Sequence, residues 1–426
     1  MRILVIGAGG FIGSHLVASL LGTGHHVTGG VRNAVALRRR FPAAAAVGIR
    51  LSTDPGYWAR LAGDFDGVVN AIGALRGDLD LIHHRAPVAL FEGCARAGLH
   101  RLVQISALGA DAGAQSQFHR TKHAADARFL GLAGERGQVG WHVIRPSLVI
   151  GRGGQSTAMF SGLGGLPVAF QLGHQAGLVQ PIHVDDLVRV LVALLEGSAP
   201  APACLDLVGP EPMRIEILID TLRDWLGFPA PRWAVPVPRP LLRSAARIGD
   251  YIPGATLNTE TLGMLARGNT ADIAPLEKTF ARPSRPLAEA LAIDPAFTAD
   301  RWHARLLTVR PVLRASLVAV WVGSGIVSAF VAPLAQSRVL LAGLGLAGRL
   351  ADTVTLGGAA LDLALGLALL LPGRTRLVCA AQIAIMLLYT ALGTIAAPEA
   401  WADPFGPFLK NIAVLVATLA LMASED

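Results

Sequence analysis

The chain has 426 residues, which is enough for two or three domains with complete cores. Its composition, 52% hydrophobic and 16% charged with a mean hydropathy of +0.50, excludes a wholly soluble enzyme. Basic and acidic residues are equal in number from residue 311 onward, so the formal charge of +7 belongs entirely to the first 310 residues.

This distribution predicts a basic part joined to a membrane part and attracted to anionic lipid headgroups or to a phosphorylated cofactor. We expect no nucleic acid partner, because no basic run is interleaved with aromatic residues. Cys94, Cys204 and Cys379 lie far apart, as is typical of a reducing compartment. Neither they nor the histidine pairs at 25–26 and 83–84 have metal-ligand spacing. We therefore expect no metal site, and histidines at the surface or at helix caps.

The first element in chain order is a short apolar strand at residues 3–6, which leads through a glycine-rich turn into an apolar helix. The turn contains Gly7, Gly10 and Gly13, and the helix begins at Phe11 and Ile12. Such a turn lets the backbone approach a pyrophosphate, whose charge the helix N–H groups stabilise. We predict a dinucleotide site made by these residues; the alternative is an ordinary tight turn. The apolar run is too short for a signal peptide.

Strands and helices alternate through the first 200 residues, which predicts an α/β fold with a doubly wound parallel Rossmann sheet. We expect further strands at 26–31, 47–51, 67–72, 101–106 and 141–149, a helix at 118–132, a long mobile loop at 151–177, and a strand end followed by a helix at 180–195. Short helices and proline-rich turns at 201–300 indicate a substrate-side subdomain and linker. The predicted domains are therefore 1–200, 201–300 and 301–426.

The C-terminal domain contains four apolar segments, which we predict to form an all-α transmembrane bundle. Residues 315–332 carry no charge over 18 positions, enough to cross the hydrocarbon core at about 1.5 Å per residue. Further spans are expected at 353–371, 377–397 and 408–422. The apolar stretch at 339–347 is too short to cross and is expected to be interfacial or re-entrant.

The charges between these spans predict their orientation. Arginines precede the first span at positions 301, 305, 310 and 314 and fill the loop after the second at positions 374 and 376, whereas the loop after the third span is acidic. Only Arg338 and Arg349 run against this pattern. The positive-inside rule then predicts a multi-pass protein of the inner (cytoplasmic) membrane, with the nucleotide-binding domain, the 373–376 loop and the C-terminus in the cytoplasm.

Asp362 lies in the middle of the second predicted span, where an ionisable residue is costly and usually paired. Lys410, near the start of the fourth span, is the expected partner. Such a pair would either line a quinone-sized cleft or only fix the packing of the helices.

The end of the second strand usually decides between NAD and NADP in dinucleotide folds. An acidic residue there binds the ribose 2′-hydroxyl, whereas an arginine suits a 2′-phosphate. This chain has Arg32, followed by arginines at 38–40, and no acid nearby. We therefore expect NADP(H) to be preferred, with NAD(H) as the alternative; the arginines at 38–40 are equally typical of a solvated basic face.

Several segments resemble the short-chain dehydrogenase/reductase superfamily in its extended or atypical form. They are the glycine turn, VVNAIG at 68–73, VQIS at 103–106, VIRPS at 143–147 and PIHVDD at 181–186. The SALGA segment from Ser106 and the GPE segment from Gly209 are similar to the branch that contains the NADPH-binding accessory subunit of respiratory complex I. From residue 310 onward the chain resembles DoxX-like membrane domains, in GAALDL at 358–363 and PFGPFLKN at 404–411.

The superfamily resemblance implies a catalytic tyrosine and a lysine one helical turn apart, both facing the nicotinamide. The matching residues here are Phe118 and Lys122, so the lysine is present and the phenol is missing. Ser106, the third member of the catalytic set, is also present. His119 is a poor substitute for the phenol because it lies on another face of the helix. Structural interpretations also exist, with Phe118 as core and Ser106 as an ordinary strand end.

Further coenzyme contacts follow from the same comparison of motifs. Asn70 and Ile72 are expected along the adenosine, and Lys122 is expected to hold the nicotinamide ribose. The run Arg145, Pro146 and Ser147 is expected beside the nicotinamide.

Two functions of different classes follow from this reading. One is an oxidoreductase anchored in the lipid bilayer that acts on an already activated, lipophilic acceptor such as a quinone, because no phenol donates a proton. The other is a non-catalytic NADPH-binding structural or redox-sensing protein, as the complex I resemblance implies. A membrane-protein partner or a homo-oligomer fits either function.

Overall fold

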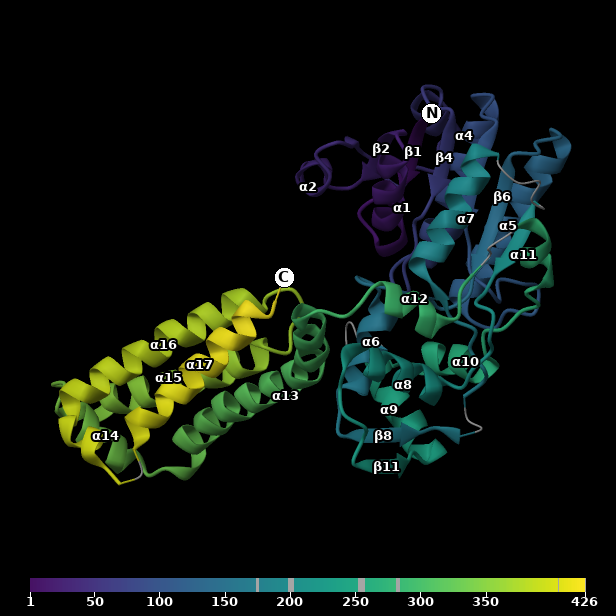
Figure 1. Ribbon diagram of the computed structural model, residues 1–426. Helices are drawn as coiled ribbons and strands as arrows, with labels where there is room; N and C mark the ends of the chain where they lie inside the picture. Colours follow the sequence, from purple (N-terminus) through teal and green to yellow (C-terminus); the bar gives the residue numbers. More distant parts are fainter. Residues whose placement is uncertain (174–175, 198–202, 252–256, 281–283, 405, 426) are drawn as a thin grey trace. The chain divides into compact units, whose positions relative to one another are not determined.

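The computed structural model describes residues 1–173, 176–197, 203–251, 257–280, 284–404 and 406–425. It divides into two compact units, Met1–Arg301 and Trp302–Asp426. Unit 1 contains all the described strands, and unit 2 is helical (Figure 1).

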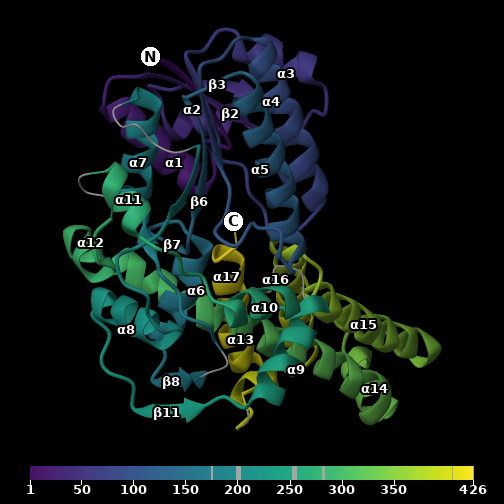
Figure 2. The same ribbon diagram turned by 90° about the vertical axis from the view of Figure 1, so that its right-hand side faces the viewer.

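A seven-stranded sheet forms the centre of unit 1 (Figure 2). The spatial order of its strands is β10 (Cys204–Leu207), β6 (Trp141–Pro146), β5 (Arg101–Ile105), β4 (Gly67–Asn70), β1 (Arg2–Ile6), β2 (His26–Val31) and β3 (Ala45–Gly48). Every neighbouring pair is parallel. The chain leaves β1 toward β3 and then returns through β4 toward β10, so the winding reverses between β1 and β4. The predicted doubly wound Rossmann sheet is confirmed.

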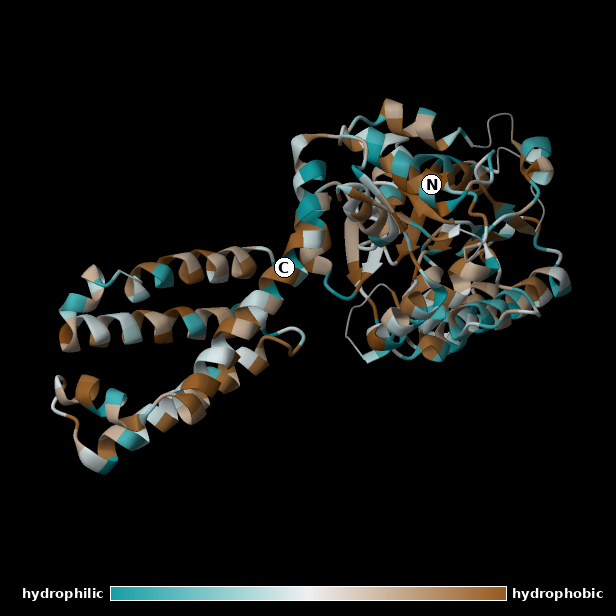
Figure 3. Cartoon of the chain, turned by 90° about the horizontal axis from the view of Figure 1, so that it is seen from below, coloured by the Kyte–Doolittle hydropathy of each residue, from teal (hydrophilic) through white to brown (hydrophobic). Residues whose placement is uncertain are grey.

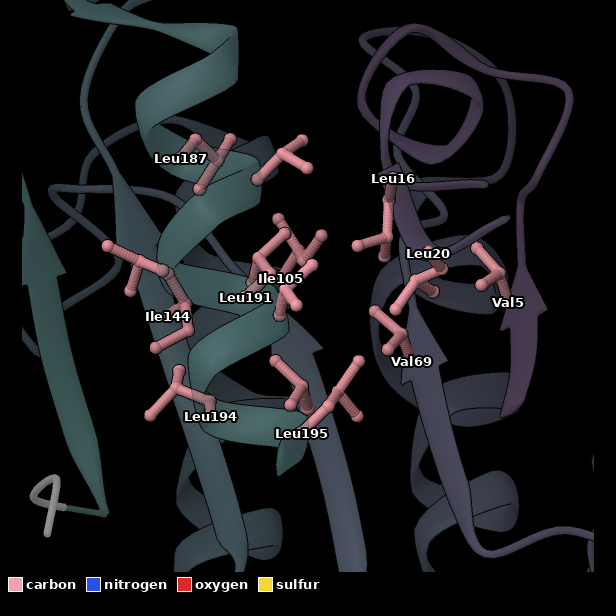
Figure 4. Close-up of a cluster of buried hydrophobic side chains, with 14 of the residues drawn as sticks. Val5, Leu16, Leu20, Val69, Ile105, Ile144, Leu187, Leu191, Leu194 and Leu195 are labelled. Atoms are coloured by element: carbon pink, nitrogen blue, oxygen red, sulfur yellow. The ribbon is translucent and has the colours of Figure 1, made fainter. Parts of the chain in front are cut away.

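Helices cover both faces of this sheet because alternate side chains of each buried strand point to opposite faces. On one face, Ile3 and Val5 belong to a cluster with leucines of α1 (Phe11–Gly22) and α7 (Val184–Glu196). Figure 4 shows Val5 and these leucines. On the other face, Leu4 and Ile6 belong to the cluster formed with α3 (Pro55–Ala62), α4 (Ala86–Arg96) and α5 (Gln117–Glu135). Each fully buried side chain of this size contributes about 1.5–3 kcal/mol.

Three strand predictions need correction. The third strand is at Ala45–Gly48 rather than 47–51, because its register with β2 pairs Thr28 with Ala45 and Val31 with Gly48. The fourth ends at Asn70 rather than 72, since the Asn70 side chain accepts a hydrogen bond from the Ile72 N–H and turns the chain. The strand predicted at 141–149 is two strands: after β6 the chain leaves the sheet, and β7 (Val149–Ile150) pairs with β9 (Ile182–His183).

The predicted long loop at 151–177 is also wrong. The chain forms α6 (Gln155–Gly164) and β8 (Val168–Gln171), of which β8 pairs with β11 (Trp233–Pro236). The helix forms because Phe160 is buried against α8 (Ile215–Leu226) and because Thr157 accepts a hydrogen bond from the Gly151 N–H. Residues 174 and 175 of the predicted loop lie outside the described part of the chain.

The segment from 201 to 300 forms part of the main sheet as well as a subdomain, because it contains the edge strand β10. Its other helices are α9 (Arg239–Tyr251), α10 (Thr259–Arg267), α11 (Ala274–Thr279) and α12 (Leu287–Ile293). In the first half of unit 1, α2 (Ala34–Arg40) connects β2 to β3, and the short π-helix η1 (Leu81–Arg85) precedes α4.

Unit 2 contains α13 (Thr298–Ile326, which begins in unit 1) with its π-helical extension η3 (Val327–Val331), α14 (Leu334–Ala342), α15 (Gly348–Ala368), α16 (Thr375–Ala396), the short 3-10 turn η4 (Pro398–Ala402) and α17 (Pro407–Ala423). Three helices, Thr298–Val331, Gly348–Ala368 and Thr375–Ala396, are long and apolar enough to cross a membrane. The predicted fourth span is the apolar helix α17 of 17 residues, and the predicted interfacial stretch overlaps α14.

Apolar residues recur along these helices, as the brown colour in Figure 3 shows, and many of their side chains are exposed. Phe330 is 80% exposed and Leu377 is 72% exposed. Exposing apolar side chains of this size to water is unfavourable. A bilayer is the solvent that such surfaces fit, so unit 2 has the surface of a membrane domain.

Two of the clusters of ion pairs in unit 2 join different helices. Arg310 and Arg314, in the middle of α13, both form ion pairs with Glu425, which follows α17. Arg314 also donates a hydrogen bond of 3.1 Å to Thr375 at the start of α16. The middle of α13, the start of α16 and the segment after α17 therefore lie close together. Arg338, one of the two contrary charges, is held in a bidentate pair by Asp352.

Candidate coenzyme-binding site

The glycine turn after β1 lies where the winding of the sheet reverses, which is where parallel sheets bind ligands. Gly7 has a φ of +86°, and a Cβ there would lie 2.9 Å from the Ala71 carbonyl. A Cβ on Gly13 would lie 2.2 Å from the Gly7 carbonyl oxygen. The Gly10 N–H donates to that same oxygen at 3.0 Å. Close contacts between backbone segments therefore require glycine at Gly7 and Gly13, whereas a Cβ on Gly10 would lie 3.3 Å from the Gly7 carbonyl oxygen.

The N-terminus of α1 has the geometry of an anion site. Gly10 is its N-cap residue, and no described side chain caps the helix. The N–H groups of its first turn, from Phe11 and Ile12, carry the positive end of the helix dipole. The Phe11 ring lies edge-on to His15, with centroids 5.5 Å apart, and packs against the loop at 151–154. This cradle of bare backbone fits the pyrophosphate of a dinucleotide.

The end of β2 carries exposed arginines. Arg32 directly follows β2 and is exposed, and Asn33 caps α2 by accepting from the Ala36 N–H at 3.1 Å. Arg40 at the end of α2 donates to the Ser14 hydroxyl of α1 at 3.3 Å. Arg32 directly after β2 and Arg40 at the end of α2 are therefore two cations on this side of unit 1. Sequence reasoning identified only Arg32 of the two as a candidate ligand.

Asn70 and Ile72, at the end of β4, have different surroundings from those we expected. Asn70 is 1% exposed, and its amide donates to Gln104 at 2.7 Å while its oxygen accepts from the Ile72 N–H at 3.3 Å. The Asn70 side chain thus shapes the turn beside Gly7. Ile72 is half-buried in that turn.

Behind the ends of β5 and β6 lies a buried polar cluster. The Ser106 hydroxyl donates to Asp126 of α5 at 2.7 Å, and Arg145 of β6 donates to the same carboxylate oxygen at 3.0 Å. Asp126 is fully buried, and burial raises its pKa despite these partners. Sequence reasoning missed Asp126. Its position four residues after Lys122, on the face that buries Ala125 and Phe129, was the available signal.

Lys122 points into the same region of unit 1. It is 3% exposed, its ammonium group donates to the Ile105 carbonyl at 2.9 Å, and burial lowers its pKa to about 8 while Asp126 opposes that shift. A lysine in this state is held close to the strand end where a ribose would lie in a Rossmann fold.

Phe118 occupies the place expected for the phenol and is half-buried. Its ring lies edge-on to His83, with centroids 5.1 Å apart, and the Lys122 nitrogen lies 5.7 Å from its centroid. His119 is 7% exposed, and its ring lies beside Gly109 and bonds Ser116 at 2.8 Å. His119 therefore faces the loop after β5, and its side chain is already occupied there.

His83 was predicted at the surface or at a helix cap, and that prediction is wrong. It is 1% exposed and accepts a hydrogen bond of 3.1 Å from the Ala74 N–H. Burial, and to a lesser degree the charge of Lys122, lowers the pKa of His83 to about 3. The imidazole is therefore neutral near neutral pH and fixes the loop after β4 against Phe118.

The run from 145 to 147 connects β6 to α5 and to the segment before β9 through side-chain hydrogen bonds. Arg145 points to Asp126, Pro146 is buried within β6, and the Ser147 hydroxyl donates to the Gln180 carbonyl before β9. The sequence motif therefore gathers α5, β6 and β9 at one strand end.

Arg152, in the loop packed on Phe11, is the centre of a further network. Its guanidinium pairs with Asp294 and with Asp300, the latter at 3.1 Å, and bonds the Pro295 carbonyl. Its own carbonyl is 3.0 Å from the His15 imidazole of α1. One residue thus links the first helix of the glycine turn to the beginning of α13.

In unit 2, Asp362 is 6% exposed and has partners other than the one we expected. The Tyr389 hydroxyl and the Ser324 hydroxyl each donate to it at 3.3 Å. Lys410 as the partner is therefore wrong. Uncharged hydroxyls on α13 and α16 satisfy the carboxyl group, which joins three helices of the unit.

Comparison with known proteins gives one match in unit 1 and one in unit 2. Residues 7–146 match the NAD(P)H-binding family, and residues 318–419 match the DoxX-like family. The chain thus carries an NAD(P)-binding domain at its N-terminus and a DoxX-like membrane domain at its C-terminus. The expected NAD(P)-binding domain and the resemblance to DoxX-like domains are confirmed.

The chain is 26% identical over 268 residues to NADH dehydrogenase [ubiquinone] 1 alpha subcomplex subunit 9, mitochondrial, of Arabidopsis thaliana. That alignment covers 58% of this chain and 63% of the relative, so it leaves more than a third of the relative unmatched.

Among solved structures, gox2253 has a TM-score of 0.55 at 18% identity, covering 71% of this chain and 99% of its own. A nucleoside-diphosphate-sugar epimerase of Pseudomonas aeruginosa has a TM-score of 0.52 at 17% identity, covering 69% and 96%. The Bordetella bronchiseptica enzyme WbmH, in complex with NAD+, has a TM-score of 0.50 at 17% identity, covering 68% and 95%. At these identities the similarity shows the fold alone.

Proposed function

We propose that this chain is a membrane-anchored NAD(P)H-binding oxidoreductase that acts on a lipophilic, quinone-like acceptor. The observation that carries the proposal is a bare glycine cradle at the N-terminus of α1, in a chain whose C-terminal helices are long and apolar enough to cross a membrane. A coenzyme site and a lipid-phase substrate are then available to one polypeptide.

The proposed coenzyme contacts follow the strand ends. Gly7, Gly10 and Gly13, with the N–H groups of Phe11 and Ile12, hold the pyrophosphate. Arg32 holds an adenosine 2′-phosphate, and Asn70 and Ile72 shape the turn along the adenosine. Lys122 holds the nicotinamide ribose, and Arg145, Pro146 and Ser147 form the wall beside the nicotinamide.

The missing phenol defines the class of acceptor. When bound, the coenzyme supplies a hydride, and the substrate must obtain its proton elsewhere because Phe118 has none to donate and His119 faces the loop after β5. A quinone meets this condition: one hydride and one proton from water convert it to the quinol, while NAD(P)H becomes NAD(P)+.

A second function, coenzyme binding without catalysis, is favoured by a different observation. The Ser106 hydroxyl donates a hydrogen bond to Asp126, and the Lys122 ammonium group donates one to the Ile105 carbonyl. Both retained members of the catalytic set therefore have hydrogen-bond partners within the fold. A structural or redox-sensing role needs no further group.

Turnover distinguishes the two functions. We expect the detergent-purified full-length protein to bind NADPH in equilibrium dialysis and to oxidise it when a short-chain quinone is added. Lys122→Ala should abolish oxidation because the ribose loses its donor. Binding without oxidation, unchanged in Phe118→Tyr, would instead establish the non-catalytic function.

The proposed preference for NADP(H) depends on Arg32. Losing one charge-assisted contact costs about 1.5–3 kcal/mol, so Arg32→Asp should weaken NADPH binding by about tenfold or more and leave NADH binding unchanged or improved. Arg38→Asp is the matched control, since Arg38 is also exposed but lies within α2 rather than directly after β2. An equal loss of affinity for both coenzymes would contradict a role at the 2′-phosphate.

We also propose that the protein lies in the inner (cytoplasmic) membrane, with the coenzyme-binding domain in the cytoplasm. The support is electrostatic: Arg310 and Arg314 lie close to the start of α16, which the arginine-containing loop precedes. Clustered positive charge beside membrane-spanning segments is typical of the cytoplasmic side. Residues 1–200, 201–300 and 301–426 are proposed as the coenzyme domain, the substrate-side subdomain and the membrane domain. Partners from the membrane or a second copy of the chain fit this arrangement.

A further inference from the structure

We propose that the outer face of α9, together with β11, binds the surface of an anionic lipid bilayer. This α9–β11 face comprises apolar residues Trp233, Val235, Leu241 and Ile248 and basic residues Arg239, Arg243 and Arg247. β8, β11 and α9 lie at the end of unit 1 opposite the N-terminus (Figure 1, Figure 2).

The sequence of α9 separates an inner from an outer face. Ala246 and Gly249 are buried, and their small side chains allow the helix to lie close to the rest of the subdomain. Leu241 and Ile248, two helical turns apart, are each 61% exposed. These leucine and isoleucine side chains therefore point away from the core of unit 1, although each would contribute to stability if buried.

The arginines of α9 recur every fourth residue and form a second stripe. Arg239, Arg243 and Arg247 are all exposed, and none forms an ion pair with another described residue. The single acid of the helix, Asp250, accepts hydrogen bonds from Thr259 at 2.9 and 3.1 Å and is thereby directed to α10. A basic stripe beside an exposed apolar stripe is typical of helices that lie in a membrane interface.

Strand β11, which precedes α9, adds further exposed apolar side chains to this face. All four residues of β11 are exposed, and Trp233 and Val235, two residues apart on one side of the strand, are 58% and 42% exposed. Arg239 also lines a cavity of about 970 Å3 together with β8 residues such as Phe170 and β11 residues such as Pro236. Tryptophan is the side chain that membrane interfaces favour most clearly, because its ring is apolar and its N–H is polar.

An anionic bilayer is the partner that fits these observations. The same chain carries helices that are long and apolar enough to cross a membrane, the first of which begins at Thr298 at the end of unit 1. Its first 310 residues carry all the net positive charge of the chain. Each arginine near an anionic leaflet strengthens surface binding by about fivefold, and the apolar side chains insert among the headgroups.

The test is hydrogen–deuterium exchange of the full-length protein in nanodiscs. We expect peptides within 239–251 to exchange at least about fivefold more slowly in discs that contain phosphatidylglycerol than in discs of phosphatidylcholine alone. The double variant Arg243→Gln/Arg247→Gln should lose this difference, and so should Leu241→Gln/Ile248→Gln. The matched control, Arg38→Gln/Arg39→Gln on exposed α2, should keep it. Unchanged exchange of β1 and α1 peptides verifies that each variant is folded.

Other results would overturn the proposal. Slow exchange of α9 that is equal in both lipids and in detergent would mean that protein covers the face, either another part of this chain or a second copy. Fast exchange of α9 in phosphatidylglycerol discs would mean that nothing covers it. Coenzyme binding plays no part in this readout, so the result is independent of the proposed oxidoreductase function.

Discussion

Replacing Gly13 by alanine is expected to weaken NADPH binding by about 100-fold or more, because the new methyl group would lie 2.2 Å from the Gly7 carbonyl oxygen. That oxygen belongs to the backbone of the turn and also accepts the Gly10 N–H, so it cannot move without rebuilding the cradle. Equilibrium dialysis of the detergent-purified full-length variant measures the effect, and thermal unfolding should show a lower midpoint.

Gly22→Ala is the control for this change, since Gly22 lies on the same helix and a Cβ there meets nothing within 4 Å. We expect it to retain full affinity and to unfold at the same or a slightly higher temperature, because alanine favours the helix. If Gly13→Ala binds NADPH as tightly as Gly22→Ala, the coenzyme does not bind at the turn after β1.

Removal of the Asp126 carboxylate is expected to be the most destabilising single change in unit 1. Asp126→Ala leaves Arg145 without its buried partner and Ser106 without its acceptor, at a cost of about 3–5 kcal/mol. Denaturant-induced unfolding of the full-length protein in detergent, followed by tryptophan fluorescence, measures the loss.

The chain contains a matched exposed pair. Asp111 binds Arg267 at 2.7 Å, with side chains 45% and 41% exposed, so Asp111→Ala should cost no more than about 1 kcal/mol. The double variant Asp126→Leu/Arg145→Met should recover much of the stability lost in Asp126→Ala, since it removes Arg145 together with its carboxylate partner. Equal costs for the Asp111 and Asp126 variants would contradict the role of burial.

The sequence predicted the elements whose signal is local. The turn at Gly7, Gly10 and Gly13 was identifiable because close backbone contacts require glycine at Gly7 and Gly13, and the buried strands were identifiable from short apolar runs. The parallel sheet itself followed from the alternation of strands with helices.

Features that depend on distant contacts were missed or wrong. The segment at 155–164 is rich in glycine and serine, yet it is helical because Phe160 packs on α8, which is separated from it by about fifty residues of sequence. The partners of Asp362 were wrong for the same reason: Ser324 and Tyr389 lie on other helices, and no spacing rule connects them to it.

Within the candidate site, local motifs indicated which residues are present but not what they contact. Ser106 and Lys122 were identified by type and spacing, whereas their hydrogen bonds to Asp126 and Ile105 depend on how α5 packs across β5. His83 was misjudged because its burial depends on Phe118, which lies on a different helix.

The network around Arg152 has a mechanical consequence. The Arg152 side chain forms ion pairs with Asp294 and Asp300, which lie close to the start of α13 in the sequence. Its backbone carbonyl bonds His15 on the helix that begins at the glycine turn. A displacement of the chain at Asp294 or Asp300 would therefore act through Arg152 on the helix that follows the glycine turn.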